Sequence, residues 1–318
     1  MHSLNRFKIE KYTPRKKKDW NNMVKNLTNN IFFFHRDYLS YFKNTLKENS
    51  LIIYDNKKNK IIGFIPGNIS KNTFYSFEKL TFGGVFLEKL YYKNVFFNDI
   101  FNNLIKYLKK KKVKKLFFKL LPSPYYTNDN ALLLNYLNNL KKSKIFTEIS
   151  SYIKLSKLNN FSKLRLRSLY KNKDLIIKKE KITKKYWNFV SKNLRLKYKV
   201  NPVHSYKEIK FLEKKFPKNI LFFSCYKRNI FLGGLVLFRF GNILKTQYVG
   251  FDEKYKYLNS QDSITSYLIK NNKSYDVKIL DFGISTENNG KFINKNLLFY
   301  KETFGAINFN YFKISCYI

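Results

Sequence analysis

Residues 230–240 and 243–251 read IFLGGLVLFRF and ILKTQYVGF, and this pair of segments decides the predicted fold. Both are rich in leucine, β-branched and aromatic residues and are bounded by Gly and Asn, which predicts two consecutive strands. The apolar spacing in Asp262–Asn271 predicts a helix, and Val277–Phe282 predicts a third strand that ends at Gly283. The order strand, strand, helix, strand is typical of an α/β unit with a mixed sheet.

The first half of the chain repeats this order of elements. The expected elements there are strands in Asn59–Pro66 and, interrupted by Gly83-Gly84, in Asn72–Leu87, then a helix in Asn98–Lys110 and a strand in Lys114–Leu121. Two copies indicate a duplicated domain rather than a solenoid, and 318 residues suffice for two domains. We therefore predict an α/β (α+β) protein of two lobes, residues 1–155 and 156–318, each a mixed twisted sheet flanked by helices.

The formal net charge of +42 is the most extreme property of the composition. Of the 63 basic residues, 55 are Lys and 8 are Arg, and Asn, Ile, Phe and Tyr are also abundant. These are amino acids of A/T-rich codons, so mutational drift explains the charge. Arg, whose planar fork reads phosphates and base edges, is scarce. Selected binding to a polyanion is the alternative.

Cysteine, histidine and apolar runs limit the class of protein further. Cys225 and Cys316 are the only cysteines and the chain has three His, so no zinc-site spacing can be assembled and we predict no metal. The N-terminus shows no apolar signal region, and the longest apolar run, Ile230–Phe238, is too short to cross a bilayer. We predict a cytoplasmic protein with reduced cysteines and no transmembrane segment.

Hydrolase and kinase signatures, such as a Walker loop or a GxSxG elbow, do not occur.

A polar segment directly after the last predicted strand of the second half is the strongest candidate site. Asp281 and Gly283 stand where the strand ends, and the segment from Ser285 to Asn289 contains no apolar residue. Ligands of open α/β sheets bind at this edge. Glu287 is the predicted proton acceptor of the site. For Asp281 and Gly283, an ordinary strand end is the alternative.

His204-Ser205 is a second candidate. His204 is the only His of the second half and titrates near neutral pH. Ser205 and Glu208 have the spacing of a capping box, so the alternative for Ser205 is an N-cap of the following helix.

Five ordered segments carry a resemblance to a known family. They are Asn201-Pro202-Val203-His204-Ser205, Gly233-Gly234, Gln247-Tyr248-Val249-Gly250, the run from Asp281 to Gly290, and Lys301-Glu302-Thr303-Phe304-Gly305-Ala306. Together with Tyr75–Gly84 of the first half, they resemble the signature of GNAT-superfamily acyltransferases on the branch that contains the FemABX-type peptidyltransferases. The resemblance covers about residues 20–315. It implies two tandem GNAT-like lobes and transfer of an acyl group, in particular acetyl from acetyl-CoA or another acyl-CoA, to an amine of a small sugar- or nucleotide-linked acceptor.

One departure from the family pattern bears on the donor. GNAT enzymes hold the CoA pyrophosphate on a Gly-rich turn at a helix N-terminus, and the corresponding segment, Asp252–Gln261, has no glycine. FemABX-type transfer from aminoacyl-tRNA to a cell-wall precursor is therefore the alternative, in which the positive charge would contribute directly. A degenerate, non-catalytic binding protein is the third hypothesis.

The resemblance also implies donor-binding residues. Lys301, Glu302, Phe304 and Gly305 match a FemABX-type segment near the acyl donor, where a lysine can hold a phosphate or offset an oxyanion; a salt bridge is the alternative for Glu302. Gln247 and Tyr248 fall on the strand whose bulge, predicted at Gly250, separates two strands in GNAT folds. In the first half, Arg36 could contact a substrate carboxylate or phosphate. Glu287, His204 and Lys301 are expected to face one cleft.

Overall fold

The computed structural model describes residues 6–28, 30–42, 44–125, 130–155 and 161–318. The chain divides into two compact units, Met1–Glu148 with Asn310–Ile318, and Ile149–Phe309. The last strand of the chain therefore contributes to the first unit. The division predicted from the sequence, at residues 155 and 156, assigns this strand to the second lobe and remains a prediction.

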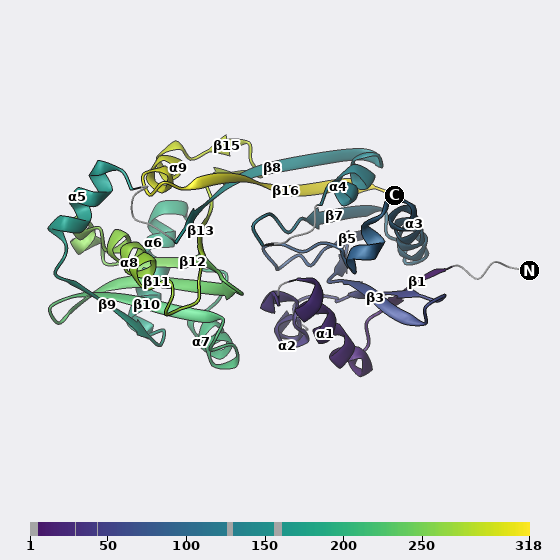
Figure 1. Ribbon diagram of the computed structural model, residues 1–318, viewed down its shortest axis with the longest axis horizontal. Helices are drawn as coiled ribbons and strands as arrows, with labels where there is room; N and C mark the ends of the chain where they lie inside the picture. Colours follow the sequence, from purple (N-terminus) through teal and green to yellow (C-terminus); the bar gives the residue numbers. More distant parts are fainter. Residues whose placement is uncertain (1–5, 29, 43, 126–129, 156–160) are drawn as a thin grey trace, which may run out of the picture. The chain divides into compact units, whose positions relative to one another are not determined.

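The first unit contains strands in two sheet segments and helices on them (Figure 1). Its strands are β1 (Phe7–Lys11), β2 (Leu51–Asp55), β3 (Lys60–Ile65), β4 (Asn68–Ser70), β5 (Thr73–Tyr75), β6 (Phe86–Leu87), β7 (Lys115–Lys119), most of β8 (Lys141–Lys154) and most of β16 (Ile307–Tyr317). Its helices are α1 (Lys17–Leu27), α2 (Arg36–Leu39), α3 (Asn94–Lys110) and α4 (Ala131–Asn138), with short 3-10 turns η1 (Pro14–Lys16), η2 (Phe32–Phe34), η3 (Ser40–Phe42) and η4 (Lys89–Tyr92). One segment has the order β1-β2-β3-β6, and the other has the order β4-β5-β7-β16.

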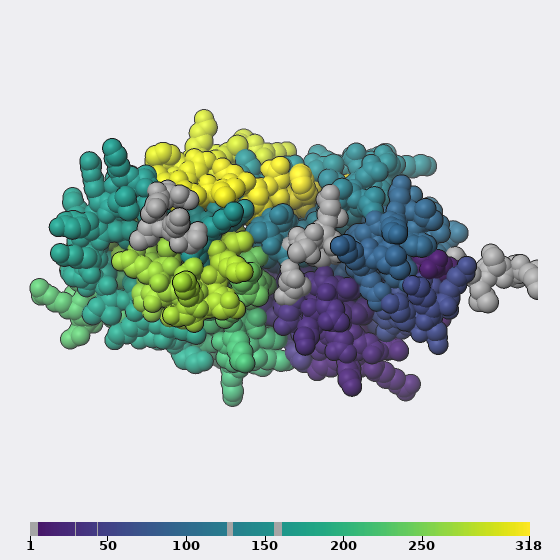
Figure 2. Space-filling view, in the orientation of Figure 1, coloured from purple at the N-terminus to yellow at the C-terminus, as the bar shows by residue number. Residues whose placement is uncertain are grey.

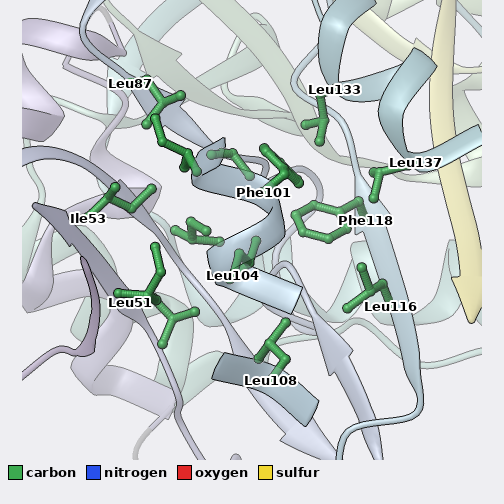
Figure 3. Packing of buried hydrophobic residues seen from close by; sticks show 14 of the residues in the cluster. Leu51, Ile53, Leu87, Phe101, Leu104, Leu108, Leu116, Phe118, Leu133 and Leu137 are labelled. Carbon is green, nitrogen blue, oxygen red and sulfur yellow. The ribbon is translucent and has the colours of Figure 1, made fainter. Parts of the chain in front are cut away.

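Helix α3 forms the centre of the first unit's core. Phe97, Phe101, Leu104 and Leu108 recur at helical spacing and are buried, so they form one apolar face. Figure 3 shows this face between Leu51 and Ile53 of β2, Leu116 and Phe118 of β7, and Leu133 and Leu137 of α4.

The second unit is built on one mixed sheet segment with the order β8-β13-β12-β11-β10-β9. Its strands are β9 (Leu175–Glu180), β10 (Ile220–Lys227), β11 (Ile230–Phe240), β12 (Ile243–Phe251) and β13 (Ile279–Ile284), with the short hairpin β14 (Thr286–Glu287) and β15 (Phe292–Ile293). Its helices are α5 (Lys163–Lys171), α6 (Lys184–Tyr198), α7 (Tyr206–Lys215), α8 (Ser260–Lys270) and α9 (Lys295–Glu302), and η6 (Glu253–Leu258) precedes α8.

The connection through α8 explains why β12 and β13 are parallel. Antiparallel neighbours β10, β11 and β12 follow one another through short turns, whereas the chain after β12 crosses the sheet as α8 and returns in the same direction. Ile264 and Leu268 of α8 are buried in the core with Leu235 of β11 and Leu280 of β13. The predicted strand, strand, helix, strand order of this half is confirmed, and the strands at 230–240 and 243–251 have the predicted bounds.

A glycine on β12 permits close packing of a helix against the sheet. A Cβ atom added to Gly250 would lie 2.8 Å from the backbone nitrogen of Val190 in α6. Gly250 itself pairs in register with Gly234, and the irregularity between β11 and β12 lies between Val236 and Leu237, opposite Gln247. The bulge predicted at Gly250 is therefore wrong: the bulged residue is Gln247, and Gly250 is required by the contact with α6.

Candidate active site in the second unit

Strands β12 and β13 separate after only three residue pairs. Their parallel pairing joins Ile243 to Ile279 and ends at Lys245 and Asp281, although β12 continues to Phe251. A cavity of about 500 Å³ opens beside the unpaired part of β12, lined by Thr246–Val249 on one side and by Phe282 on the other. The sequence-based expectation that two strands splay here is met.

Helices and a loop complete the cavity wall. Residues of α6, the segment from Asp252 to Asp262, and Leu297, Tyr300 and Lys301 of α9 contribute to it. Of the residues predicted from the sequence, Gln247, Tyr248 and Lys301 line the cavity; the first two are on β12, and Lys301, on α9, is 53 residues after Tyr248 in the chain. The fold therefore brings together side chains that only the family resemblance linked.

Lys301 is buried at the end of α9 and holds the turn that follows β13. Its Nζ donates to the carbonyl oxygens of Gly283 and Ile284, at 2.6 and 2.9 Å, and to Ser285 Oγ at 2.7 Å. Burial lowers the pKa of the Lys301 ammonium to about 7; nearby Asp281 opposes this and Lys245 adds to it. Lys301 is thus a titratable group at the cavity wall near neutral pH.

Asp281 is a structural carboxylate behind this turn. It is fully buried and its Oδ1 accepts from the Gly283 backbone N–H at 2.7 Å and from Ser150 Oγ at 3.2 Å. Lys245 Nζ lies 3.9 Å from the other oxygen, Oδ2. Gly283 has a φ of 81°, a conformation that favours glycine, so its place in the sequence reflects the turn.

The N-terminal end of α8 carries a buried carboxylate. Asp262, in the first turn, accepts from Arg165 Nη1 at 2.6 Å and from the Tyr300 hydroxyl at 3.1 Å. Burial raises the pKa of Asp262, and the bonds from Arg165 and Tyr300 oppose the rise. Arg165 also donates to Thr303 Oγ1 at 2.8 Å, and its guanidinium lies 4.4 Å from the centre of the Tyr300 ring.

Arg165 anchors helix α5 to the cavity wall together with Ser168, whose hydroxyl also donates to Asp262 at 3.2 Å. Helix α5 has no buried residue, and its long side chains project from the surface at the left of Figure 2. Arg165 joins this helix to α8 through Asp262 and to the end of α9 through Thr303. It therefore fixes two elements of the cavity wall.

Several wall residues were missed by the sequence analysis. They are Asn193, Lys197 and Tyr198 of α6, and Asp252, Glu253, Gln261, Asp262 and Tyr300. Asn193 Nδ2 donates to Glu253 Oε1 at 3.1 Å, and the Phe251 N–H donates to Asn193 Oδ1 at 2.9 Å, which ties α6 to the end of β12. A sequence pattern does predict α6: the N-cap residue Thr183 is followed by apolar residues at helical spacing, namely Tyr186, Trp187 and Val190.

His204 contacts Tyr248, a residue of the cavity wall, but does not itself border the cavity. It is buried and does not line the cavity; its Nδ1 lies 2.6 Å from the hydroxyl of Tyr248, which does. Burial lowers the pKa of His204, and Glu208 opposes the decrease. Ser205 is the N-cap of α7, and its side chain and that of Glu208 form the expected capping box. Ser205 thus has the capping role that was the alternative.

The other predicted residues lie outside the cavity wall. Glu287 is exposed in β14, where its Oε1 accepts from Asn294 Nδ2 at 3.2 Å. Glu302 accepts from Asn308 Nδ2 at 2.9 Å. Phe304 is buried against Phe161, with 5.1 Å between ring centres, and Gly305 follows α9 with a φ of 74°.

Arg36 belongs to the first unit, and its guanidinium group already binds a carboxylate of the protein. Nη1 and Nη2 donate to the two carboxylate oxygens of Glu48 at 2.6 and 2.9 Å, and the guanidinium lies 3.6 Å from the centre of the Tyr12 ring. The bidentate contact predicted for a substrate is thus made within the protein.

Neither a metal cluster nor a membrane-spanning helix is found in the described part of the chain. Among residues 6–28, 30–42, 44–125, 130–155 and 161–318, no three His, Cys, Asp or Glu side chains converge as metal ligands. Over the same ranges, no helix combines the length and the apolar character needed to span a bilayer.

Solved structures share this arrangement, whereas no family model matches the sequence and no curated protein sequence matches it significantly. FemX superposes with a TM-score of 0.68 over 98% of this chain and 97% of its own, at 10% identity. The chain has a FemAB-like, tandem GNAT fold. A tandem GNAT protein from the clavulanic acid biosynthesis pathway superposes with a TM-score of 0.55 over 98% of both chains, at 8% identity. L-PGS from Bacillus licheniformis gives 0.55 over 96% of this chain and 92% of its own, at 10% identity.

The FemAB-like fold confirms the predicted resemblance and the predicted two-lobed α/β architecture. The likeness is one of fold at 8 to 10% identity. It covers nearly the whole length of the chains compared.

Proposed function

We propose that the protein is an N-acyltransferase whose activated acyl group is bound in the cavity between β12 and β13. The observation that carries this proposal is the separation of the two strands beyond Lys245 and Asp281, which opens a cavity of about 500 Å³. A cavity of this size holds an acyl or aminoacyl group together with part of its carrier. The FemAB-like fold supports the same class of reaction.

The reaction needs a neutral amine and stabilisation of an oxyanion. The nitrogen of the acceptor attacks the carbonyl carbon of the donor; the new C–N bond forms and the bond from that carbon to the ester oxygen, or thioester sulfur, breaks. The nitrogen loses one proton, and the leaving oxygen or sulfur gains one. His204, through the Tyr248 hydroxyl at the cavity wall, is the proposed proton acceptor. Glu287, the proton acceptor predicted from the sequence, is exposed in β14 and lies outside the cavity wall.

Lys301 is proposed to hold the turn after β13 and, in its protonated form, to add a positive charge to the cavity wall. Its Nζ donates to three protein oxygens, so the protonated form acts on an oxyanion as a nearby charge and not through a direct hydrogen bond. The same contacts fix the turn from Gly283 to Ser285. Burial lowers the pKa of Lys301 to about 7, so this charge is lost as the pH rises above that value.

An aminoacyl ester of tRNA is the proposed donor. A CoA pyrophosphate is usually held by a Gly-rich turn at a helix N-terminus, and here Asn259 in place of glycine adopts the left-handed conformation before α8. Asp252, Glu253 and Asp262 line the cavity together with Lys197, Lys256 and Lys301. The carboxylates can attract the ammonium group of an aminoacyl ester. FemX, with a TM-score of 0.68, is consistent with this preference.

Acyl-CoA remains the second candidate donor, because a tandem GNAT protein matches 98% of both chains. The third hypothesis, a non-catalytic binding protein, was based on the missing glycines in Asp252–Gln261, and a cleft filled by the protein's own side chains would favour it. The open cavity does not provide that support.

Binding and transfer assays distinguish the two donors. We expect charged tRNA to bind more tightly than deacylated tRNA, with affinity that falls steeply as salt is added, and labelled amino acid to move to an amine from a panel of amino sugars and nucleotide-linked acceptors. Calorimetry with CoA should show no binding. Equal affinity for both tRNA forms together with CoA binding would replace this donor with acyl-CoA, and failure of transfer from both donors would remove the enzymatic proposal.

A further inference from the structure

One end of the first unit carries a concentration of lysines. Helix α3 ends there, β7 and β8 begin there and β16 ends there (Figure 1). The terminal lysine patch consists of Lys109, Lys110, Lys111, Lys112, Lys114, Lys115, Lys141, Lys142 and Lys144. All of these are exposed except Lys115, which is half-buried.

Tyr317 joins the parts of this patch. It pairs with Lys115 in the ladder between β16 and β7. Its ring centre lies 5.7 Å from Lys115 Nζ and 5.8 Å from Lys142 Nζ, so lysines from β7 and β8 face the same ring. The backbone N–H of Ile318 donates to the Lys114 carbonyl oxygen at 3.1 Å. The lysines therefore form one surface although they come from three segments of the chain.

The patch differs from the rest of this lysine-rich chain in the stretch of sequence that carries it. From Phe101 to Thr147 the described residues include neither Asp nor Glu. By contrast, Glu208 and Glu213 are interspersed with the lysines of α7, where Lys210 pairs with Glu213. Drift toward A/T-rich codons explains an excess of lysine everywhere, but it does not explain a run of described residues without an acidic side chain. Glu10 of β1 lies near Tyr107 of α3 and pairs with Lys8, so the positive potential of the patch is local and is compensated by few acidic side chains.

We propose that the terminal lysine patch binds the surface of an anionic phospholipid bilayer. Clusters of four to eight basic residues are enough to bind anionic lipid headgroups, and lysine suits a diffuse layer of phosphates because it acts as a point charge. RNA recognition generally uses the bidentate fork of Arg, and the patch contains no Arg. Tyr317, 44% exposed, and Ile145, 37% exposed, supply the amphipathic and apolar contacts that suit a membrane interface.

Vesicle flotation tests this surface without any measurement of activity. The full chain is mixed with vesicles of phosphatidylcholine alone, or with vesicles in which about a third of the lipid is phosphatidylglycerol. We expect binding to the anionic vesicles only, and loss of binding in high salt. A variant with Lys109→Gln, Lys110→Gln, Lys142→Gln and Lys144→Gln should lower the partition coefficient on the order of a hundredfold or more.

A matched variant separates the patch from net charge. The control variant removes an equal number of positive charges, four, from exposed positions in and after α7, with the substitutions Lys207→Gln, Lys214→Gln, Lys215→Gln and Lys218→Gln. It should reduce vesicle binding by no more than about threefold. Equal losses in the two variants would show that net charge alone is responsible, and no binding by the wild type would overturn the proposal. Loss of tRNA binding in the patch variant with unchanged vesicle binding would assign the surface to RNA instead. Far-UV circular dichroism should show that all variants remain folded.

Discussion

Lys245 and Asp281 form the last residue pair that joins β12 to β13, and beyond this pair the edge of β12 that faced β13 borders a cavity. Both side chains are buried and lie 3.9 Å apart, and Lys301 of α9 donates a hydrogen bond to the turn that follows β13. The ion pair thus marks the point where the sheet stops being continuous. The position of the cavity follows from this break in the pairing.

Filling the cavity at β12 should block donor binding. Val249 lines the cavity and is only partly buried, and its other contacts are with the core of the second unit. Val249→Phe therefore adds ring volume beside the cavity, where there is empty space. We expect the KM for the donor to rise at least about tenfold, with a thermal midpoint close to that of the wild type because little overpacking occurs. Val249→Ala, which enlarges the cavity, is the control. Unchanged KM in Val249→Phe would place the donor elsewhere.

The sequence predicted the parts of the fold that depend on local patterns. The apolar runs of β11 and β12 are long and bounded by Gly and Asn, so their bounds could be read directly. The capping box at Ser205 is also a local signal, and the structure contains it. The bulge was misplaced because it depends on how Val236 and Leu237 pair with the neighbouring strand, which the sequence of β12 does not encode by itself.

The cavity wall was less predictable because its residues are joined by long-range contacts. Asp262 reads in the sequence as an ordinary acidic residue in the first turn of a helix, and its partner Arg165 is 97 residues away. Arg36 shows a different limit of the sequence. An isolated Arg suggested a contact with a substrate, but its guanidinium donates both hydrogen bonds to Glu48 of the same unit.

Removal of Arg165 should destabilise the second unit, since it leaves the buried Asp262 carboxylate without its cationic partner. We expect Arg165→Ala to lower the free energy of unfolding by about 3–5 kcal/mol, measured by urea denaturation. Arg167→Ala, in the same helix but exposed, should change it by less than about 0.5 kcal/mol.

The pH dependence identifies the cause of that loss. Burial already raises the pKa of Asp262, and without Arg165 the folded-state pKa should rise further above the unfolded value. The folded state then binds more protons than the unfolded state in that range, so the variant should recover stability relative to the wild type as the pH falls from 7 toward 5. A deficit that is independent of pH would indicate lost packing against Tyr300 instead of an uncompensated charge.

The role of Glu287 as general base is a prediction from the sequence, and it has a direct test although this carboxylate lies outside the cavity wall. Glu287→Gln keeps the shape and the contact with Asn294 while it removes the proton acceptor, so turnover should fall on the order of a hundredfold. Asn294→Ser removes the contact with Glu287 but leaves the carboxylate and keeps a side-chain oxygen for the N-cap of α9, so it should change turnover only slightly. If Glu287→Gln turns over like the wild type, the base is another group, and Tyr248→Phe then tests the route through His204.

Lys301 should make the stability of the second unit depend on pH in the alkaline range. Its pKa falls from 10.5 to about 7 on folding, so between these values the unfolded state binds one proton more than the folded state, and stability should rise with pH. Lys301→Met lacks this proton, and all other titrating groups are common to both proteins. We therefore expect the free energy of unfolding of the wild type, relative to Lys301→Met, to increase by about 2–3 kcal/mol from pH 7.5 to pH 9.5. Urea denaturation at the two pH values measures the difference. A constant difference would show that the three oxygens around Nζ keep the ammonium charged, and in that case Lys301 carries a permanent positive charge at the cavity wall.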